Sequence, residues 1–215
     1  PGRVGNRWAW VMAALFLSCN AEENKKPNAE SDTPVKTQVS APSFDADSAY
    51  AYVAQQVAFG PRVPNTPEHA ACASWLASEL ERHGAEVTVQ EGRVRAFDGT
   101  ILNVKNIVGT FHPESRDRIL LFAHWDTRPF ADKDTVRLRE PIDGANDGAS
   151  GVGVLLEIAR QLGLESADVG VDIVFFDAED YGRPEWLPAM QDGYKTWCLG
   201  SQFWAENPHR FGYRA

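Results

Sequence analysis

The sequence predicts an α/β domain in which helices flank a mixed sheet. Stretches typical of buried strands alternate with helical patterns in the second half of the 215-residue chain, and a predicted β-hairpin precedes them. A further observation locates function on this fold. The apolar residues 171–176, interrupted only by Asp172, run directly into the acids Asp177, Glu179 and Asp180. Because open α/β sheets bind ligands outside the carboxyl ends of their strands, we expect an active site here.

The first half of the predicted domain contains two helices and the hairpin. Apolar spacing predicts a helix over residues 47–59. Thr66, which precedes a proline, is typical of a helix N-cap, so a second helix is expected to start there and to end near His83. Two alternating segments joined by an Asp-Gly turn follow and predict paired strands at residues 87–97 and 102–111.

The second half alternates strands and helices. Residues 119–123 and 171–176 are short, nearly continuous apolar stretches, so we expect interior positions in the sheet for both. Apolar side chains on one side predict a helix at residues 150–162 between them, and a last helix is predicted at 197–206. A sheet with two covered faces usually needs more strands, so we expect further elements of the domain beyond Ala215.

The first 19 residues resemble a bacterial lipoprotein signal. Arg3 and Arg7 precede an apolar stretch, residues 8–17, that is too short to span a bilayer as a helix. Cys19 follows closely and occupies the place of the cysteine that such signals lipidate. An ordinary cleaved signal is the alternative. Either signal predicts an exported protein.

Residues 20–43 are predicted to form a disordered tether, because they contain almost no large apolar side chains. A lipid on Cys19 and this tether would hold the domain, residues 44–215, at the periplasmic or outer surface of a bacterial membrane. The net charge of −9, with no basic cluster, argues against a nucleic-acid partner. Two further cysteines, Cys72 and Cys198, could pair, but the helical pattern around Cys72 favours a buried free thiol.

Three loops with acidic residues are expected to meet at one edge of the sheet. His124 and Asp126 follow the strand at 119–123, Asp147 precedes the next helix, and Glu179 and Asp180 follow the strand at 171–176. Parallel strands joined by a right-handed crossover end at the same edge. Carboxylates and an imidazole at this edge suit a zinc ion, with a neighbouring carboxylate as general base and acid.

Each of these residues also has a structural interpretation. Asp147 could be a turn residue or an N-cap, and Glu179 and Asp180 could lie in a solvated loop. His124 taken alone is more often a satisfied core histidine. Their common position at strand ends, with glycines around them, favours the functional interpretation.

Five motifs resemble those of bacterial glutaminyl cyclases, which belong to the wider zinc aminopeptidase superfamily. They are GPRVP at 60–64, HWDTRP at 124–129, GANDGASG at 144–151, FFDAED at 175–180 and WCLGSQ at 197–202. The resemblance implies a zinc-exopeptidase-like fold that binds one zinc ion. It also implies that Asp147 and Asp180 are zinc ligands, that Glu179 is the catalytic acid and base, and that Trp186 lies in the substrate pocket. His124 and Asp126 would support these ligands or, in a zinc aminopeptidase, help to hold a second metal.

The resemblance further implies that a zinc-binding His and another active-site Asp follow Ala215. Without them the 215 residues could form an inactive fragment. The implied reaction is cyclisation of an amino-terminal glutamine of a peptide or protein to pyroglutamate, with release of ammonia. A zinc aminopeptidase is one alternative, and a lipid-anchored binding module without catalytic activity is another.

Overall fold

The computed structural model describes residues 41–165, 167–189 and 196–214. The predicted signal, residues 1–19, and the predicted tether up to residue 40 lie outside the described residues. Residues 41–215 form one compact unit. None of the helices in the described ranges has the length and apolar character needed to cross a membrane.

A four-stranded mixed sheet forms the centre of this unit. Its strands are β1 (Glu86–Arg95), β2 (Ile101–Phe111), β3 (Arg118–His124) and β4 (Gly170–Phe176), in the order β1-β2-β4-β3. The hairpin β1–β2 and the pair β2–β4 are antiparallel, whereas β3 and β4 are parallel. The mixed α/β fold class predicted from the sequence is therefore confirmed.

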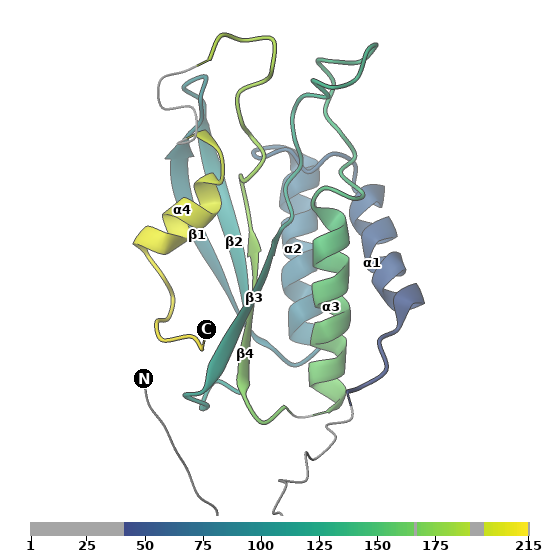
Figure 1. Cartoon of the computed structure of the whole chain (residues 1–215), viewed down its shortest axis with the longest axis vertical. Helices are drawn as coiled ribbons and strands as arrows, with labels where there is room; N and C mark the ends of the chain where they lie inside the picture. The colour runs from purple at the N-terminus through teal and green to yellow at the C-terminus, as the bar shows by residue number, and fades with distance from the viewer. Residues whose placement is uncertain (1–40, 166, 190–195, 215) are drawn as a thin grey trace, which may run out of the picture. The chain divides into compact units, whose positions relative to one another are not determined.

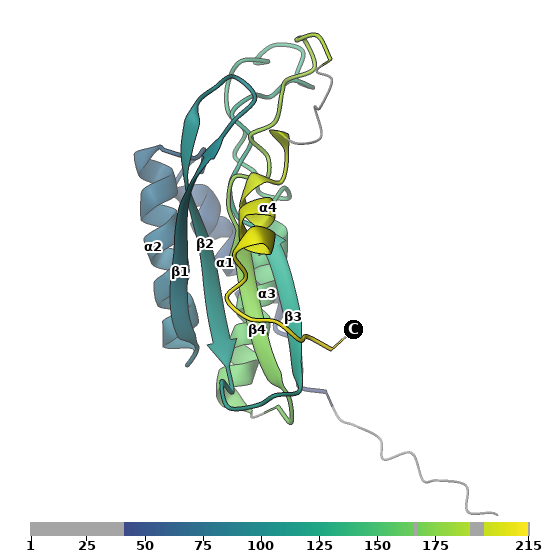
Figure 2. The same ribbon diagram turned by 90° about the vertical axis from the view of Figure 1, so that its left-hand side faces the viewer.

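Helices cover both faces of the sheet (Figures 1 and 2). Helices α2 (Pro67–Arg82) and α3 (Ala149–Leu164) pack on one face, and α1 (Ala46–Ala58) packs against α3. The short helix α4 (Leu199–Glu206) lies on the other face, over β1 and β2. All four helices and all four strands lie close to their predicted positions, and the Thr66 side chain accepts the His69 N–H as the N-cap of α2.

The main core lies between α2, α3 and the sheet. Leu76 and Leu80 of α2, Leu156 of α3 and Ile173 of β4 are fully buried there. A smaller cluster on the opposite face joins Trp204 of α4 to the sheet and to other apolar side chains. Cys72 is buried in the main core as a free thiol, and burial raises its pKa to about 12. Cys198 is also free, and it is exposed.

The interior sheet position predicted for β3 stays a prediction. The apolar stretch in β3 indicated an interior strand, but among the described strands β3 pairs only with β4 and lies at an edge of the sheet. One face of β3 packs on the main core through Ile119, Leu121 and Ala123. On the other face Phe122 is 63% exposed. An uninterrupted apolar stretch therefore does not by itself show that both faces are buried.

At the amino-terminal end of β4 a buried ion pair joins the sheet to the segment after α4. Arg118 and Asp172 are almost fully buried and form a bidentate pair, with 2.6 Å between Nη2 and Oδ1 and 3.2 Å between Nε and Oδ2. The Tyr213 hydroxyl donates to Oδ2 at 2.8 Å, and His209 Nε2 lies 3.5 Å from the same oxygen. Burial alone would raise the pKa of Asp172, but hydrogen bonds from His209, Arg118 and Tyr213 hold it well below its usual value.

Candidate active site

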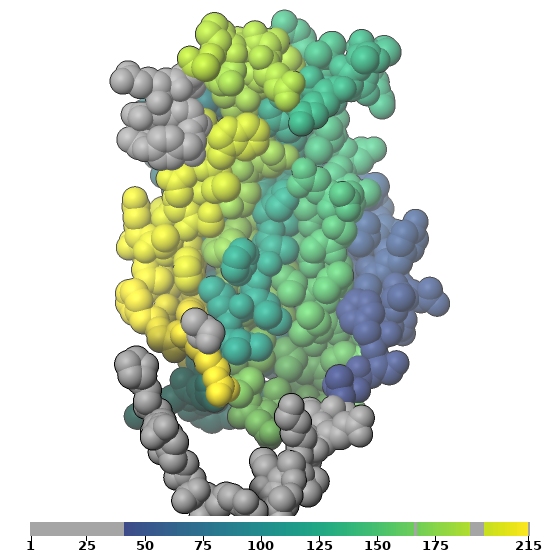
Figure 3. Space-filling model, in the orientation of Figure 1, coloured from purple at the N-terminus to yellow at the C-terminus, as the bar shows by residue number. Residues whose placement is uncertain are grey.

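The loops that carry the predicted residues gather at one end of the folded unit. Because β3 and β4 are parallel and His124 lies beside Phe176 in register, the residues that follow both strands emerge together. Figure 3 shows the loops after β3 and β4 side by side at this end. Helix α3 also begins here, directly after Asp147. The structure therefore brings His124, Asp126, Asp147, Glu179 and Asp180 together, as the crossover rule predicted.

Asp126 binds the backbone that follows the carboxyl end of β4. Its carboxylate is fully buried and accepts the backbone N–H groups of Glu179 and Asp180, each at 3.1 Å. His124 Nδ1 lies 3.5 Å from Asp126 Oδ1. Asp126 thus fixes the backbone that presents the two acids and lies behind His124, which supports the interpretation that it assists the ligands.

His124 connects the loop after β3 to Asp147. Its Nε2 lies 2.8 Å from Asp147 Oδ1. The N-cap of α3 is Gly148, so Asp147 does not cap the helix, and its carboxylate is 62% exposed and faces the cavity. The N-cap interpretation of Asp147 is therefore wrong.

The two carboxylates also change the acidity of His124. Burial alone would lower the pKa of His124, but the carboxylates of Asp126 and Asp147 raise it to about 9.

Asp180 is the acid with the fewest partners at this site. Its Oδ2 is buried and has no hydrogen-bond partner in the described part of the chain, and its Oδ1 lies 3.8 Å from Arg128 Nη1. Burial, together with the charges of Asp126 and Asp147, raises the pKa of Asp180 to about 7. A buried oxygen without a partner costs free energy, and such groups are concentrated at functional sites.

Glu179 is held by α4. The Ser201 N–H donates to Oε1 at 2.6 Å, and the Ser201 hydroxyl donates to Oε2 at 2.8 Å. Burial raises the pKa of Glu179, while these two hydrogen bonds oppose the rise. A carboxylate with a raised pKa next to a candidate metal site is suited to proton transfer.

Asp177, the first of the three acids after β4, is held by contacts with α2 and β2. It is fully buried and lies 2.8 Å from Nε2 of His69, which comes from the first turn of α2. Its carboxylate also accepts the Lys105 N–H at 2.7 Å. The sequence analysis did not identify His69 or Ser201 as part of this end of the sheet, because both come from helices whose docking is a long-range feature of the fold.

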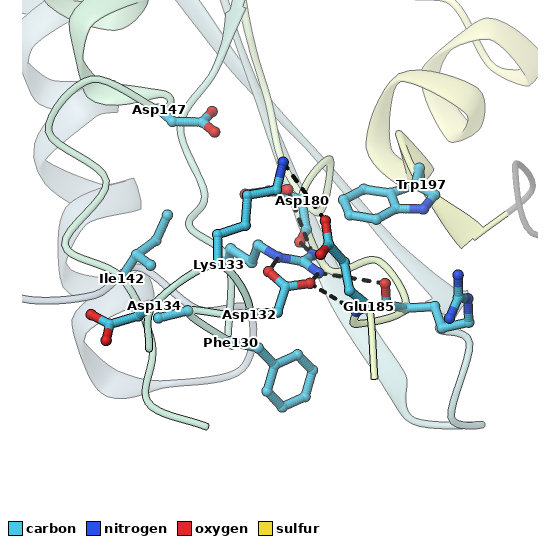
Figure 4. A pocket seen from close by; sticks show the side chains of 12 residues that line it. Phe130, Asp132, Lys133, Asp134, Ile142, Asp147, Asp180, Glu185 and Trp197 are labelled. Carbon is cyan, nitrogen blue, oxygen red and sulfur yellow. Dashed lines mark hydrogen bonds and ion pairs between the residues drawn. The ribbon is translucent and has the colours of Figure 1, made fainter. Parts of the chain in front are cut away.

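A cavity of about 740 Å³ opens at this end of the sheet (Figure 4), and of the acids described above Asp147 and Asp180 line it. It is lined by Arg128, Phe130, Ala131, Asp132, Lys133, Asp134, Ile142, Asp147, Asp180, Arg183, Glu185 and Trp197. Asp147 and Asp180 lie at the inner end, on segments that face each other.

Arg128 forms one wall of this cavity. Its guanidinium makes a bidentate pair with Asp132, with 2.9 Å between Nε and Oδ1 and 2.5 Å between Nη2 and Oδ2, and it donates to the backbone carbonyl of Asp180 at 3.2 Å. It also lies over the Trp197 ring, 4.7 Å from the ring centroid. Arg128 therefore joins the loops after β3 and β4 to the segment before α4.

The tryptophan that lines the cavity is Trp197, whereas Trp186 lies outside the lining. Trp186 packs edge to face on Phe130, with 5.4 Å between the ring centroids, and Arg139 lies 5.3 Å from its centroid. Phe130 itself lines the cavity, so Trp186 packs against one of its lining side chains. Its assignment to the substrate pocket remains a prediction, and Trp197 is an aromatic candidate that the sequence analysis missed.

The donors at the inner end fit part of a zinc site. Asp147 and Asp180 supply carboxylate oxygens, Asp180 Oδ2 is buried without a partner, and His124 lies directly behind Asp147. Oxygen and nitrogen donors of this kind suit zinc. Within the described ranges no three His, Cys, Asp or Glu side chains are grouped so that they could hold a metal ion by themselves. The two carboxylates are therefore an incomplete ligand set.

Comparison with solved structures shows close similarity to zinc exopeptidases and glutaminyl cyclases. A glutaminyl cyclase of Tannerella forsythia is 61% identical, with a TM-score of 0.77, over 81% of this chain and 60% of that one. A Zn-dependent exopeptidase of Parabacteroides distasonis is 57% identical, with a TM-score of 0.78, over 81% of this chain and 60% of that one. A glutaminyl cyclase of Bacteroides thetaiotaomicron, solved with N-acetylhistamine, is 56% identical, with a TM-score of 0.78, over 82% of this chain and 61% of that one.

The chain thus spans about 60% of the length of these structures. The resemblance to bacterial glutaminyl cyclases and the zinc-exopeptidase-like fold are confirmed. The family model described as Peptidase family M28 matches residues 106–215, which is just over half of the chain and includes every predicted site residue. The chain therefore belongs to peptidase family M28.

Proposed function

We propose that the protein to which this chain belongs is a zinc-dependent glutaminyl-peptide cyclotransferase. The observation that carries the proposal is the set of acids Asp147, Glu179 and Asp180, which meet at one end of the sheet in a chain 61% identical to a glutaminyl cyclase. The substrate would be a peptide or protein with an amino-terminal glutamine, and the products would be the pyroglutamyl peptide and ammonia.

Asp147 and Asp180 would hold one zinc ion at the inner end of the cavity. When bound, zinc would supply a Lewis acid that polarises the γ-amide carbonyl of the substrate glutamine. Zinc usually has four ligands, so the site would need at least one further protein ligand. Asp126 and His124 keep the two carboxylates in place through the contacts described above.

Glu179 would carry protons between the two nitrogens of the reaction. The α-amine of the substrate attacks the γ-amide carbon, and Glu179 takes the proton that this nitrogen loses. The bond from the γ-carbon to the amide nitrogen then breaks, and Glu179 returns the proton to that nitrogen, which leaves as ammonia. Because the amine and the amide belong to one substrate residue, a cavity that holds them in a folded conformation supplies much of the rate.

A product analysis of the complete gene product tests this proposal. The protein is incubated with a short peptide that begins with glutamine, and ammonia and the peptide mass are followed. We expect one ammonia per peptide and a peptide mass lower by the mass of ammonia. Release of free glutamine without ammonia would contradict the cyclase and support the aminopeptidase alternative. Absence of any product would support the alternative of a binding module without catalytic activity.

We also propose that the protein is exported and attached to a bacterial membrane by a lipid on Cys19. The support is the pattern of the first 19 residues. In cells that produce the complete protein, we expect it in the membrane fraction, and we expect Cys19→Ala to move it to the soluble fraction. Equal distribution of the two proteins would contradict lipid attachment.

A further inference from the structure

Ser201 holds the carboxylate of Glu179 through both of its oxygens, and the Cys198 thiol is a further hydrogen-bond partner of this carboxylate. The backbone N–H of Ser201 donates to Oε1 at 2.6 Å and the hydroxyl donates to Oε2 at 2.8 Å. The Cys198 carbonyl lies 3.1 Å from the same hydroxyl, so the closer partner of its one proton is the carboxylate. Hydrogen bonds to a charged carboxylate are stronger than those between neutral groups.

The start of α4 is fixed against the end of β4, so Ser201 has little freedom to move away. The Leu199 N–H donates to the Ala178 carbonyl at 3.1 Å, and the Cys198 N–H donates to the Glu179 carbonyl at 2.9 Å. A β-carbon at position 200 would collide with the Asp177 carbonyl oxygen, so only glycine permits this close approach.

Asn106 of β2 ties the same two segments together from within the sheet. Its side-chain oxygen accepts the Asp177 N–H at 3.0 Å, and its side-chain nitrogen donates to the Gly200 carbonyl at 2.9 Å. Asn106 is fully buried. Hydrogen bonds thus fix both the backbone of Glu179, through Asp126, and its side chain, through Ser201.

The first turn of helix α4 is not capped by the side chain of its own N-cap residue. Its N-cap residue, Cys198, has a positive φ of 56° and makes no side-chain capping hydrogen bond. The Glu179 carboxylate accepts the N–H that such a cap would satisfy. A cap needs only this backbone N–H, whereas the hydroxyl of Ser201 makes a second bond that fixes the rotation of the carboxylate.

We propose that Ser201 is a positioning residue for the catalytic acid and base Glu179. This inference rests on the proposed function, because it concerns the step that Glu179 performs. A glutamate side chain has three rotatable bonds, and a displacement of about 1 Å at a reacting group can cost on the order of 10²-fold in rate. The hydroxyl keeps Oε1 and Oε2 in one orientation as the proton is taken up and returned.

The test compares Ser201→Ala with Ser201→Thr in the complete gene product. Ser201→Ala keeps the backbone N–H and removes only the hydroxyl, whereas Ser201→Thr keeps both. The matched control is Ser74→Ala on α2, where an exposed hydroxyl donates to the carbonyl of the preceding turn. The measurements are kcat and KM for a glutamine-initiated peptide, bound zinc per chain, and the midpoint of thermal unfolding.

For Ser201→Ala we expect kcat to fall about tenfold, with unchanged KM and unchanged zinc content. Its midpoint of thermal unfolding should equal that of the control Ser74→Ala. For Ser201→Thr we expect a kcat close to that of the unsubstituted protein. The inference is overturned if Ser201→Ala keeps its kcat, if Ser201→Thr is as slow as Ser201→Ala, or if zinc content, KM or stability falls together with kcat.

The unsubstituted protein distinguishes failure of the proposed function from failure of the Ser201 inference. If the unsubstituted protein releases no ammonia from the peptide, the cyclase is wrong and the role of Ser201 falls with it. If the unsubstituted protein is active and only the Ser201 variants depart from expectation, the cyclase stands and the positioning role alone is wrong.

Discussion

Two buried acids near opposite ends of β4, Asp172 and Asp180, differ in their partners and in their pKa values. Asp172 has Arg118 as a bidentate partner and also binds Tyr213, and its pKa lies well below its usual value. Asp180, just past the other end, has one buried oxygen without a partner, and its pKa is raised to about 7. Both carboxylates are largely buried, so burial alone does not distinguish them.

The difference between the two acids lies in their partners. Around Asp172 the protein supplies every charge and donor that the carboxylate needs, so the cluster joins the sheet to the segment after α4. Around Asp180 the charges of two other carboxylates, Asp126 and Asp147, outweigh that of Arg128, whose Nη1 lies 3.8 Å from Oδ1. An arrangement that is costly without a cation is suited to bind one. The unpartnered end of β4 is therefore where we place the chemistry.

The largest expected effect is on turnover at the unpartnered end. Glu179→Gln keeps the shape of the side chain, and its amide oxygen can still accept one of the two Ser201 hydrogen bonds, but the amide cannot take up the proton, so we expect kcat to fall by about 10²–10⁴-fold. Steady-state kinetics with a glutamine-initiated peptide provide the measurement. Glu206→Gln at the end of α4 is the control, and its kcat should not change. A Glu179→Gln variant with the kcat of this control would show that the proton carrier is another group.

The second prediction compares the two acids directly through stability. Asp172→Asn leaves Arg118 buried without its charged partner, so we expect the free energy of unfolding to fall by about 3–5 kcal/mol. Asp180→Asn removes a charge that two neighbouring carboxylates repel and whose contact with Arg128 is 3.8 Å long, so with metal chelated we expect a change of about 1 kcal/mol or less. Urea unfolding followed by tryptophan fluorescence measures both. Equal losses would remove the distinction between the two ends.

The third prediction concerns pH and extends the comparison to another partnered acid, Glu157 of α3. A hydrogen bond from Arg160, and further ones from Gln161 and the Asp45 backbone, lower the pKa of Glu157 from 4.5 to about 2. The folded state therefore gains stability from this carboxylate above about pH 4.5 and loses it as the pH falls towards 2. Unfolding midpoints measured across this range should fall with acid, and the fall should be smaller in Glu157→Gln. An unchanged acid slope in that variant would contradict the assignment.

The smallest effect is expected at the outer rim of the cavity. Lys133 and Glu185 face each other across it at 3.7 Å, but their side chains are 84% and 65% exposed. Exposed pairs of this kind contribute little, so Lys133→Ala should change the free energy of unfolding by less than about 1 kcal/mol. We also expect kcat/KM to change by less than about threefold, since the pair touches no predicted ligand. A loss similar to that of Glu179→Gln would place the chemistry at the rim.

Most of the fold could be predicted because its signals are local. The Thr66 cap, the Asp98-Gly99 turn and the apolar spacing of the helices each act within a few residues. The position of β3 in the sheet is not a local feature, because it depends on which strands pair; among the described strands β3 pairs only with β4. The pairing of Arg118 with Asp172 depends in turn on the register of β3 against β4.

The site residues likewise fall into those that could be predicted from the sequence and those that could not. The meeting of His124, Asp147 and Glu179 follows from the handedness of the crossover, which the order of elements in the sequence already contains. Ser201 and His69 were missed because α4 and α2 reach the site only through packing on the sheet. Trp197 was not predicted to line the cavity, because which side chain of the segment between β4 and α4 turns inward depends on packing.

Bound zinc tests the central claim most directly. The complete gene product and its variants are purified, and zinc per chain is measured by elemental analysis. We expect one zinc ion in the unsubstituted protein and in Glu179→Gln, and little or none in Asp180→Asn and Asp147→Asn. Zinc retained in Asp180→Asn, or two tightly held ions in the unsubstituted protein, would contradict the claim that the unpartnered end of β4 forms a site for a single zinc ion.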